Sequence, residues 1–324
     1  MHLLGEGSVK KFWIQKMPDK DQIGIGLFEF TNDYSIFDWG KMPQTIPDKG
    51  EALKRESVHW FRRLEEEGIK THFIEDVDKN KIKVKAFRKL EYNQISQETI
   101  NYMIPLEIIF RNKVTKASSL YRRLRAGKVD PTVYGLPKNY KPDVDEVIVL
   151  PEPIVEFSTK IEELDRYIKD DEAIKLAGIS KLELASIKET ALKVNRIITK
   201  EVKKRDLDHI DGKIEIAFGP EREIYVCDTV GTSDENRFLY RGFDLSKQML
   251  RDYYKLNGWY YELVKAREDK TNLPKPPLMD EKYNILVNDA YKALCIGLTG
   301  ERWGDGETPT LDSIIKSYSD FLNA

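Results

Sequence analysis

The order of two kinds of segment constrains the fold of this chain most strongly: short strand-like runs come first, and helical patterns follow. Gly24–Phe30 is strand-like and ends at a Thr-Asn-Asp turn signal. Thr71–Val77 and Ile82–Phe87 flank a polar turn at residues 78–81, which is typical of a hairpin. Met103–Arg111 is a continuous apolar run, as expected of a buried strand. The first part of the chain therefore predicts sheet.

Helical periodicity is clearest in two segments. An apolar stripe runs along Glu51–Glu67, and Gly68 suits the C-terminal end of that helix because glycine readily adopts a positive φ. Ser180-Lys-Leu-Glu183 has the form of a capping box, and the apolar stripe behind it continues towards Asp206. Both segments predict helices that pack one face on a core.

Less regular sequence lies between these two helical segments. From Lys128 to Pro153 prolines recur and periodicity fades, which predicts a long ordered loop. Helices are expected after Ser246 and over Tyr283–Leu294, the second ending before Gly297. Strands first and helices later favour an α+β fold of antiparallel sheets with flanking helices.

The length of the chain predicts two lobes, since 324 residues are many for one hydrophobic core. We expect a β-rich N-terminal lobe over residues 1–101. A larger α+β lobe is expected over residues 102–324.

Composition excludes several classes of function. The net charge of −2 excludes a broad nucleic-acid surface, and no run approaches the roughly 20 apolar residues of a membrane span. The start of the chain lacks the apolar core of a signal peptide, so a cytoplasmic location is expected. Two cysteines make neither a disulfide framework nor a zinc site. No Walker loop, dinucleotide GxGxxG, GxSxG or HExxH motif occurs.

Charged residues recur on one face of the segment that follows His209. In an extended strand Asp211, Lys213 and Glu215 share a face, and the two carboxylates lie about 13 Å apart at roughly 3.3 Å per residue. A turn and a returning apolar strand end on Asp228, which a hairpin could bring near Glu215 or Asp211. Such carboxylates are how Mg²⁺ is usually held, although an exposed hairpin with surface charges has the same pattern.

A polar loop with an arginine at its end follows the same hairpin. Asp228–Arg237 is rich in hydroxyls, and its backbone N–H groups and guanidinium could orient phosphate or carboxylate. Arg111 ends an apolar strand, where its charge needs either a bound anion or an acidic partner.

The motifs of the chain, taken in order, resemble those of the SAICAR synthetase family. These enzymes of purine biosynthesis have two lobes related to ATP-grasp folds. They couple a carboxyaminoimidazole ribonucleotide (CAIR) to L-aspartate, and they split ATP to ADP and phosphate. The matching segments are Asn32–Asp38, Ile46–Gly50, Ile104–Asn112, Leu150–Ile154, Ser158–Lys160, Asp211–Glu215, Asp228–Arg237 and Lys247–Asp252.

The resemblance implies specific roles. Glu215 and Asp228 would hold Mg²⁺, and with Lys213 they form the implied catalytic set. ATP, the co-substrate, would contact Lys213, Lys10, Lys160 and the backbone near Met103. The implied substrate-binding residues are Asp38, Lys49, Glu107, Arg111, Ser118, Asp165, Asp211, Asp234 and Arg237. The implied partners are the small molecules ATP, CAIR and L-aspartate, without nucleic acid or membrane. The oligomeric state stays open, a homo-oligomer included.

Some positions depart from the family motifs. Ser8 stands where a lysine is common, Thr229 replaces an acidic residue, Ser233 replaces a proline, and Leu164 replaces a histidine. Two other readings therefore stay open. One is a related ATP-dependent ligase or kinase acting on another anionic substrate, and the other is a non-catalytic nucleotide-binding module.

Overall fold

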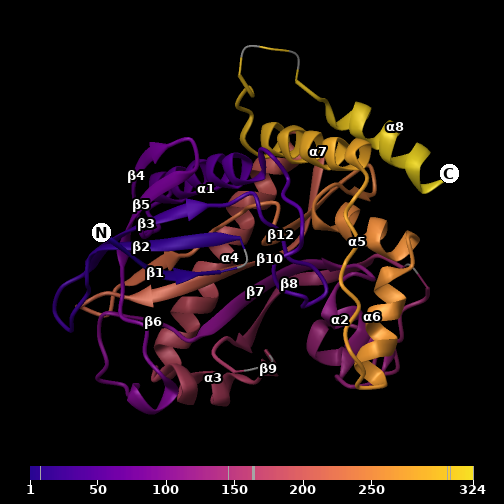
Figure 1. Cartoon of the computed structure of the whole chain (residues 1–324). Helices are drawn as coiled ribbons and strands as arrows, with labels where there is room; N and C mark the ends of the chain where they lie inside the picture. Colours follow the sequence, from indigo (N-terminus) through magenta and orange to yellow (C-terminus); the bar gives the residue numbers. More distant parts are fainter. Residues whose placement is uncertain (8, 145, 163–164, 305, 307, 324) are drawn as a thin grey trace.

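The computed structural model describes every residue except 8, 145, 163–164, 305, 307 and 324. The described residues form an α+β fold in which two antiparallel sheets are flanked by helices (Figure 1). The fold class predicted from the sequence is thus confirmed. Ser8 and Leu164, two of the departures named above, lie outside the described residues.

The first sheet is built entirely from the N-terminal part of the chain. Its order is β1-β2-β3-β5-β4 and all its pairings are antiparallel. Helix α1 (Lys49–Glu66) packs on it, and Gly68 follows with a φ of 76°. The predicted strand, hairpin and helix in this region are confirmed. The strands are β1 (His2–Glu6), β2 (Lys10–Lys16), β3 (Gly24–Phe30), β4 (Phe73–Asp78) and β5 (Lys81–Ala86).

The second sheet contains the eight strands from β6 to β13, and β10 lies at its centre. Along the main path the order is β13-β12-β10-β7-β8-β9, and β6 and β11 also pair with β10. The strands are β6 (Tyr102–Met103), β7 (Leu106–Val114), β8 (Ile148–Thr159), β9 (Tyr167–Ile168), β10 (Leu207–Phe218), β11 (Ile224–Cys227), β12 (Asn236–Tyr240) and β13 (Phe243–Asp244).

The apolar run at Met103–Arg111 is two strands instead of the single one predicted. Met103 pairs with Ala217, whereas Ile108 pairs with Ile214 on the same strand β10. The break falls at Pro105, which has no N–H to donate to a ladder. The expectation of burial holds, since Ile108 is fully buried.

The long loop predicted up to Pro153 ends earlier, because β8 begins at Ile148. Pro151 and Pro153 lie at a register irregularity, between the pairs Lys113–Val149 and Arg111–Ile154. Proline is tolerated at such a bulge because no ladder hydrogen bond is lost there. The remaining loop carries the 3-10 turn η2 (Pro131–Tyr134) and covers a small separate core that includes Leu120, Tyr134 and Leu150.

Helix α4 (Lys181–Lys203) confirms the predicted capping box, since the Ser180 hydroxyl accepts from the Glu183 N–H at 3.2 Å. The helix packs across β10, β7 and β8. A helix after Ser246 is also confirmed as α5 (Lys247–Leu256). Four further helices, α2 (Ser119–Arg125), α3 (Asp170–Ala177), α6 (Trp259–Glu268) and α8 (Leu311–Leu322), were not predicted.

Helix α7 (Glu281–Thr299) continues past Gly297, so the predicted end was wrong. A Cβ atom on Gly297 would lie 3.1 Å from Leu311 and 3.2 Å from Leu207. This glycine therefore serves close packing inside the helix, and Gly300, with a φ of 76°, ends it. Helix α7 lies alongside α1 (Figure 1).

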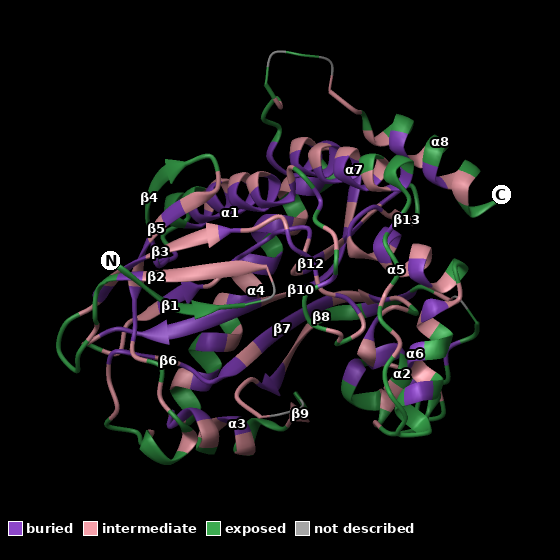
Figure 2. Ribbon diagram, in the orientation of Figure 1, coloured by how far each residue is buried: buried purple, intermediate pink, exposed green. Residues whose placement is uncertain are grey.

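Strand β11 connects the two sheets. On one side it pairs with β10, and on the other Val226 exchanges backbone hydrogen bonds of 2.9 and 3.0 Å with Lys70 and His72. One hydrophobic core accordingly runs from Phe30 in the first sheet to Ile214 in the second. Buried residues are concentrated along β7 and β10 (Figure 2). None of the helices in the described ranges is both long and apolar enough to cross a membrane.

Candidate functional site

The charged face of β10 forms the centre of the site. Asp211, Lys213 and Glu215 alternate with Gly212 and Ile214, so the three charged side chains share a face. Gly212 is required by its surroundings, because a Cβ atom there would lie 1.9 Å from the Asn236 side-chain oxygen. The strand therefore combines a close-packed rear face with a charged front.

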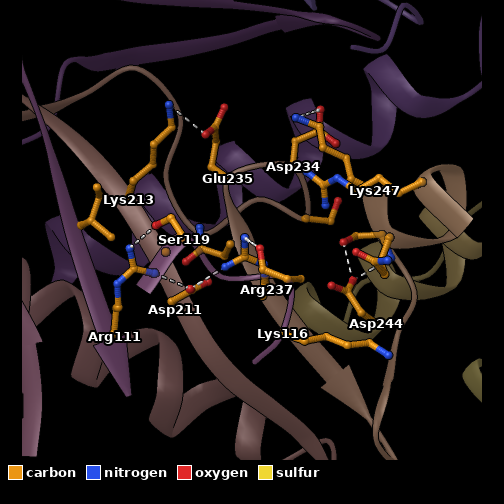
Figure 3. Close-up of a pocket in the computed structure, with 18 of the residues that line it drawn as sticks. Arg111, Lys116, Ser119, Asp211, Lys213, Asp234, Glu235, Arg237, Asp244 and Lys247 are labelled. Carbon is orange, nitrogen blue, oxygen red and sulfur yellow. Dashed lines mark hydrogen bonds and ion pairs between the residues drawn. The ribbon is translucent and has the colours of Figure 1, made fainter. Parts of the chain in front are cut away.

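Two pockets adjoin this front. The charged pocket has a volume of about 560 Å³ and contains Asp211 and Lys213 (Figure 3). The apolar pocket has a volume of about 670 Å³ and contains Glu215. Its apolar lining includes Phe12, Ile14, Val84, Phe87, Met103 and Ile104. Lys213 and Glu215, which are two residues apart on β10, thus line two different pockets.

Two carboxylates lie at the polar end of the apolar pocket. Glu215 pairs with Cys227 in the ladder, which brings Asp228 beside it. Glu215 forms an ion pair with Lys160, and Asp228 forms one with Lys10. Burial, reinforced by Asp228, raises the pKa of Glu215. Burial also opposes ionisation of Asp228, but Lys10 and Lys160 outweigh it and lower the pKa of that carboxyl. The site therefore contains one firmly ionised carboxylate next to one that protonates more easily.

Asp228 adopts a strained backbone conformation, with a φ of 64°. Asp38, another predicted site residue, has a φ of 52°. Left-handed non-glycine residues are uncommon, and they cluster where a fold must aim a side chain into a site.

Asp211 is the centre of the charged pocket. Its Oδ2 accepts from Arg111 Nη1 at 2.8 Å and from Arg237 Nη1 at 2.5 Å (Figure 3). Arg111 is only 3% exposed, and every N–H of its guanidinium is engaged within the protein. Its partners are Glu156 at 2.7 Å, Asp211, Ser118 at 3.1 Å, Ser119 at 3.4 Å and Tyr167 at 2.9 Å. Of the two alternatives for the charge of Arg111, a bound anion or an acidic partner, the structure shows acidic partners, Glu156 and Asp211.

Lys213 is held between two carboxylates. It contacts Glu107 directly. It also lies 3.1 Å from Glu235 Oε2 (Figure 3). Burial works against its charge, but Glu235, Glu107 and Glu215 outweigh burial and raise the pKa of Lys213 well above its usual value. Lys213 is therefore a fixed positive charge at neutral pH and no general base.

Ser233, which replaces the proline of the family motif, has a specific partner. Its N–H donates to Glu56 Oε2 at 2.8 Å, and its hydroxyl lies 3.0 Å from the same oxygen. A proline could not donate this backbone hydrogen bond. Burial raises the pKa of Glu56 to about 8, against the opposing hydrogen bonds from Ser233. Helix α1 thus anchors the loop that presents Asp234.

The raised pKa of Glu56 predicts a pH dependence of stability. The folded state retains a proton that the unfolded state releases above 4.5, so the contribution of Glu56 to the free energy of unfolding falls as pH rises from about 4.5 to about 8. The slope is up to about 1.4 kcal/mol per pH unit. In denaturant titrations, the free energy of unfolding of Glu56→Gln should rise relative to that of the unmodified protein between acidic and mildly alkaline pH.

Glu51→Gln is the matched control, since Glu51 lies on the same helix but pairs with surface Lys79 at 3.0 Å. It should keep the full pH dependence. An equal pH dependence in the Glu56 variant would show that Glu56 does not titrate in this range.

Most of the predicted site residues lie in the two pockets. Those in the charged pocket are Asp38, Glu107, Arg111, Asp211, Lys213, Asp234 and Arg237. Those in the apolar pocket are Met103, Lys160, Glu215 and Asp228. The structure therefore groups residues from distant parts of the sequence around β10.

Four predicted residues do not line either pocket. Lys10 and Lys49 form ion pairs with the pocket residues Asp228 and Asp234. Ser118 is fully buried as the N-cap of α2, and the neighbouring Ser119 lines the charged pocket instead. Asp165 is exposed, and its pKa is raised by partial burial and then by Glu107.

Several pocket residues were missed. Lys247 and Arg251 lie in the matching segment Lys247–Asp252, but they were not among the predicted site residues. Burial and then Arg237 lower the pKa of Arg251, as expected where cations converge. Tyr167 and Glu235 had no sequence signal, since their roles depend on β9 reaching Arg111 and on the loop reaching Lys213.

The fold and the site define a class: an α+β protein with an apolar pocket and a cationic pocket adjoining one strand. The comparisons with known proteins agree with this class. The family model described as SAICAR synthetase matches residues 3–267. The chain belongs to the SAICAR synthetase family, whose fold is related to ATP-grasp.

Individual relatives extend the match over nearly the whole chain. A Thermoplasma acidophilum protein named phosphoribosylaminoimidazole-succinocarboxamide synthase is 40% identical over 94% of this chain and 100% of its own length. A relative from Archaeoglobus fulgidus is 38% identical over 98% of this chain and 99% of its own length. A solved SAICAR synthetase in complex with ADP is 30% identical, with a TM-score of 0.62, over 93% of this chain and 99% of that one.

Proposed function

We propose that this chain joins CAIR and L-aspartate in an ATP-dependent reaction that gives SAICAR, ADP and phosphate. The observation that carries the proposal is the face of β10, where Lys213 lines the charged pocket and Glu215 lines the apolar pocket. Two residues along a strand span about 7 Å. A nucleotide in one pocket and an anionic substrate in the other would therefore meet at Lys213.

The apolar pocket fits the base of a nucleotide, with Met103 and Phe87 in its wall and Lys160 at its polar end. Lys10 and Lys160 could turn from their carboxylates to the phosphates when a nucleotide binds. In this proposal residues 1–101 form the lobe that covers the nucleotide, and residues 102–324 form the lobe that carries the metal and ribonucleotide sites.

Glu215 and Asp228 fit a magnesium ion. Among the residues that the structure describes, no group of three or more His, Cys, Asp or Glu side chains could hold a metal. A site of two carboxylates suits Mg²⁺, which usually takes its other ligands from substrate phosphates and water. When bound, the ion would neutralise charge on those phosphates.

The charged pocket fits a ribonucleotide phosphate. Arg237, Lys247 and Arg251 line it, and the last two come from the first turns of α5. Arg111 would act differently, because its donors already hold Asp211, Glu156 and Tyr167 in place. We propose that Arg237, Lys247 and Arg251 bind the phosphate while Arg111 orients the residues around it.

The proposed chemistry has two displacement steps. A carboxylate oxygen of CAIR attacks the γ-phosphorus of ATP, and the bond to ADP breaks to leave an acyl phosphate. The amine of aspartate then attacks the acyl carbon, forms the amide bond, expels phosphate and loses a proton. The protein mainly aligns the reactants and neutralises charge, as is usual for phosphoryl transfer.

An assay with ATP, Mg²⁺, CAIR and L-aspartate tests the proposal. We expect equal amounts of ADP and SAICAR, measured by coupled ADP detection and by mass spectrometry. Nucleotide binding without product would contradict it, and ADP release with another acid in place of CAIR would favour a related ligase or kinase. A cytoplasmic location stays a prediction.

A further inference from the structure

Helix α7 lies beyond residue 267, where the match to the family model ends, and it contacts one residue of the charged pocket. Tyr291 on this helix is fully buried and donates its hydroxyl to Asp234 Oδ1 at 2.8 Å. Asp234 itself lines the charged pocket. A segment beyond the match to the family model therefore contacts a predicted substrate-binding residue.

The hydrogen bonds of Asp234 show what this contact does. Oδ2 faces Lys49 Nζ at 2.8 Å and Lys247 Nζ at 3.4 Å, while Oδ1 accepts from Tyr291. A carboxylate accepts about four hydrogen bonds. Lys49, Lys247 and Tyr291 surround the Asp234 carboxylate, whose side chain is only 2% exposed, so its orientation is set by groups within the protein.

Lys49 and Tyr291, which both contact this carboxylate, also pack against each other. Both side chains are fully buried, and the Lys49 ammonium lies 5.6 Å from the centre of the Tyr291 ring. Lys247 is different because it lines the pocket, where it can face a bound anion. If Tyr291 no longer occupied Oδ1, Lys247 could take its place and turn away from the pocket.

Helix α7 is well fixed for such a role. Asn288 Oδ1 accepts from the Asp48 N–H at 2.8 Å, and Lys292 lies 2.7 Å from the Asp48 carboxylate. Asp48 directly precedes α1, which carries Lys49 and Glu56. The two helices thus hold the loop around Asp234 from one side.

We propose that Tyr291 is a positioning residue for the charged pocket, which fixes the Asp234 carboxylate so that Lys247 stays available to the anionic substrate. The inference rests on the proposed function. It also assigns the part of the chain after residue 267 a role in substrate binding besides its role in packing.

Tyr291→Phe tests the proposal, since it removes one oxygen atom and keeps the ring. We expect KM for CAIR to rise about tenfold, because a hydrogen bond to a charged group is lost, while kcat changes less than about threefold. Tyr283→Phe is the control, because its hydroxyl, on the same helix, donates at 2.8 Å to the Met249 carbonyl, outside the pocket. It should leave KM unchanged even if both variants lower Tm.

A second comparison separates positioning from general destabilisation. In an Asp234→Asn background, Tyr291→Phe should add little to the rise in KM, because the carboxylate that it positions is gone. Equal KM values for the two tyrosine variants would overturn the inference. If Tyr291→Phe does not fold, Lys49→Gln, which removes the other buried donor, should raise KM, and an unchanged KM there would also overturn it. No turnover by the unmodified protein would instead contradict the proposed function.

Discussion

Lys213→Met is expected to lower kcat for ADP release by about 10²- to 10³-fold, the usual cost of removing a preorganised charge from a reacting centre. Lys213 is held by Glu107 and Glu235, and these carboxylates keep it charged. A fixed charge acts most on the transition state, where negative charge moves from ATP to the acceptor. The loss should therefore appear mainly in kcat, with a smaller change in KM for ATP.

The measurement is steady-state ADP release with saturating substrates, alongside circular dichroism to verify folding. Lys113→Met is the matched control, because Lys113 also lies on the second sheet but pairs with Asp208 outside both pockets. Lys213→Arg keeps the charge and should retain more activity than Lys213→Met. A kcat for Lys213→Met equal to that of the Lys113 control would remove Lys213 from the reaction.

Local patterns predicted the elements of this fold well. The capping box at Ser180 and the hairpin at residues 73–86 depend on neighbouring residues alone, so the sequence contains all the information they need. The end of α7 could not be predicted in this way. Gly297 looks like a helix end, yet it allows close contact with Leu207 and Leu311, which are distant in sequence.

The same division applies to the site. The alternation along β10 placed Asp211, Lys213 and Glu215 on one face, and the hairpin brought Asp228 beside Glu215. However, the pattern could not show that these charges face two separate pockets, because the apolar pocket is completed by β2, β5 and the segment around Met103. Nor could it show that Arg111 is fully engaged, since its partners come from β8, α2, β9 and β10.

Asp211→Asn should lower the free energy of unfolding by about 3 kcal/mol or more, the usual cost of removing one partner from a buried ion pair. The Asp211 side chain is 6% exposed and accepts from both Arg111 and Arg237. Asparagine keeps the shape but removes the charge. Arg111 retains Glu156, whereas the Asp211 carboxylate is the ion-pair partner that the structure gives Arg237.

Urea denaturation of Asp211→Asn and Asp208→Asn measures this difference. Asp208 lies on the same strand and forms an ion pair with Lys113 at 2.5 Å. Because both side chains are partly exposed, loss of this ion pair should cost no more than about 1 kcal/mol. The same carboxylate also sets the direction of Arg237, so Asp211→Asn should raise KM for CAIR in any folded fraction. Equal losses of stability in the two variants would show that the cluster of Asp211, Arg111 and Arg237 is solvated in solution and contributes no more than a surface ion pair.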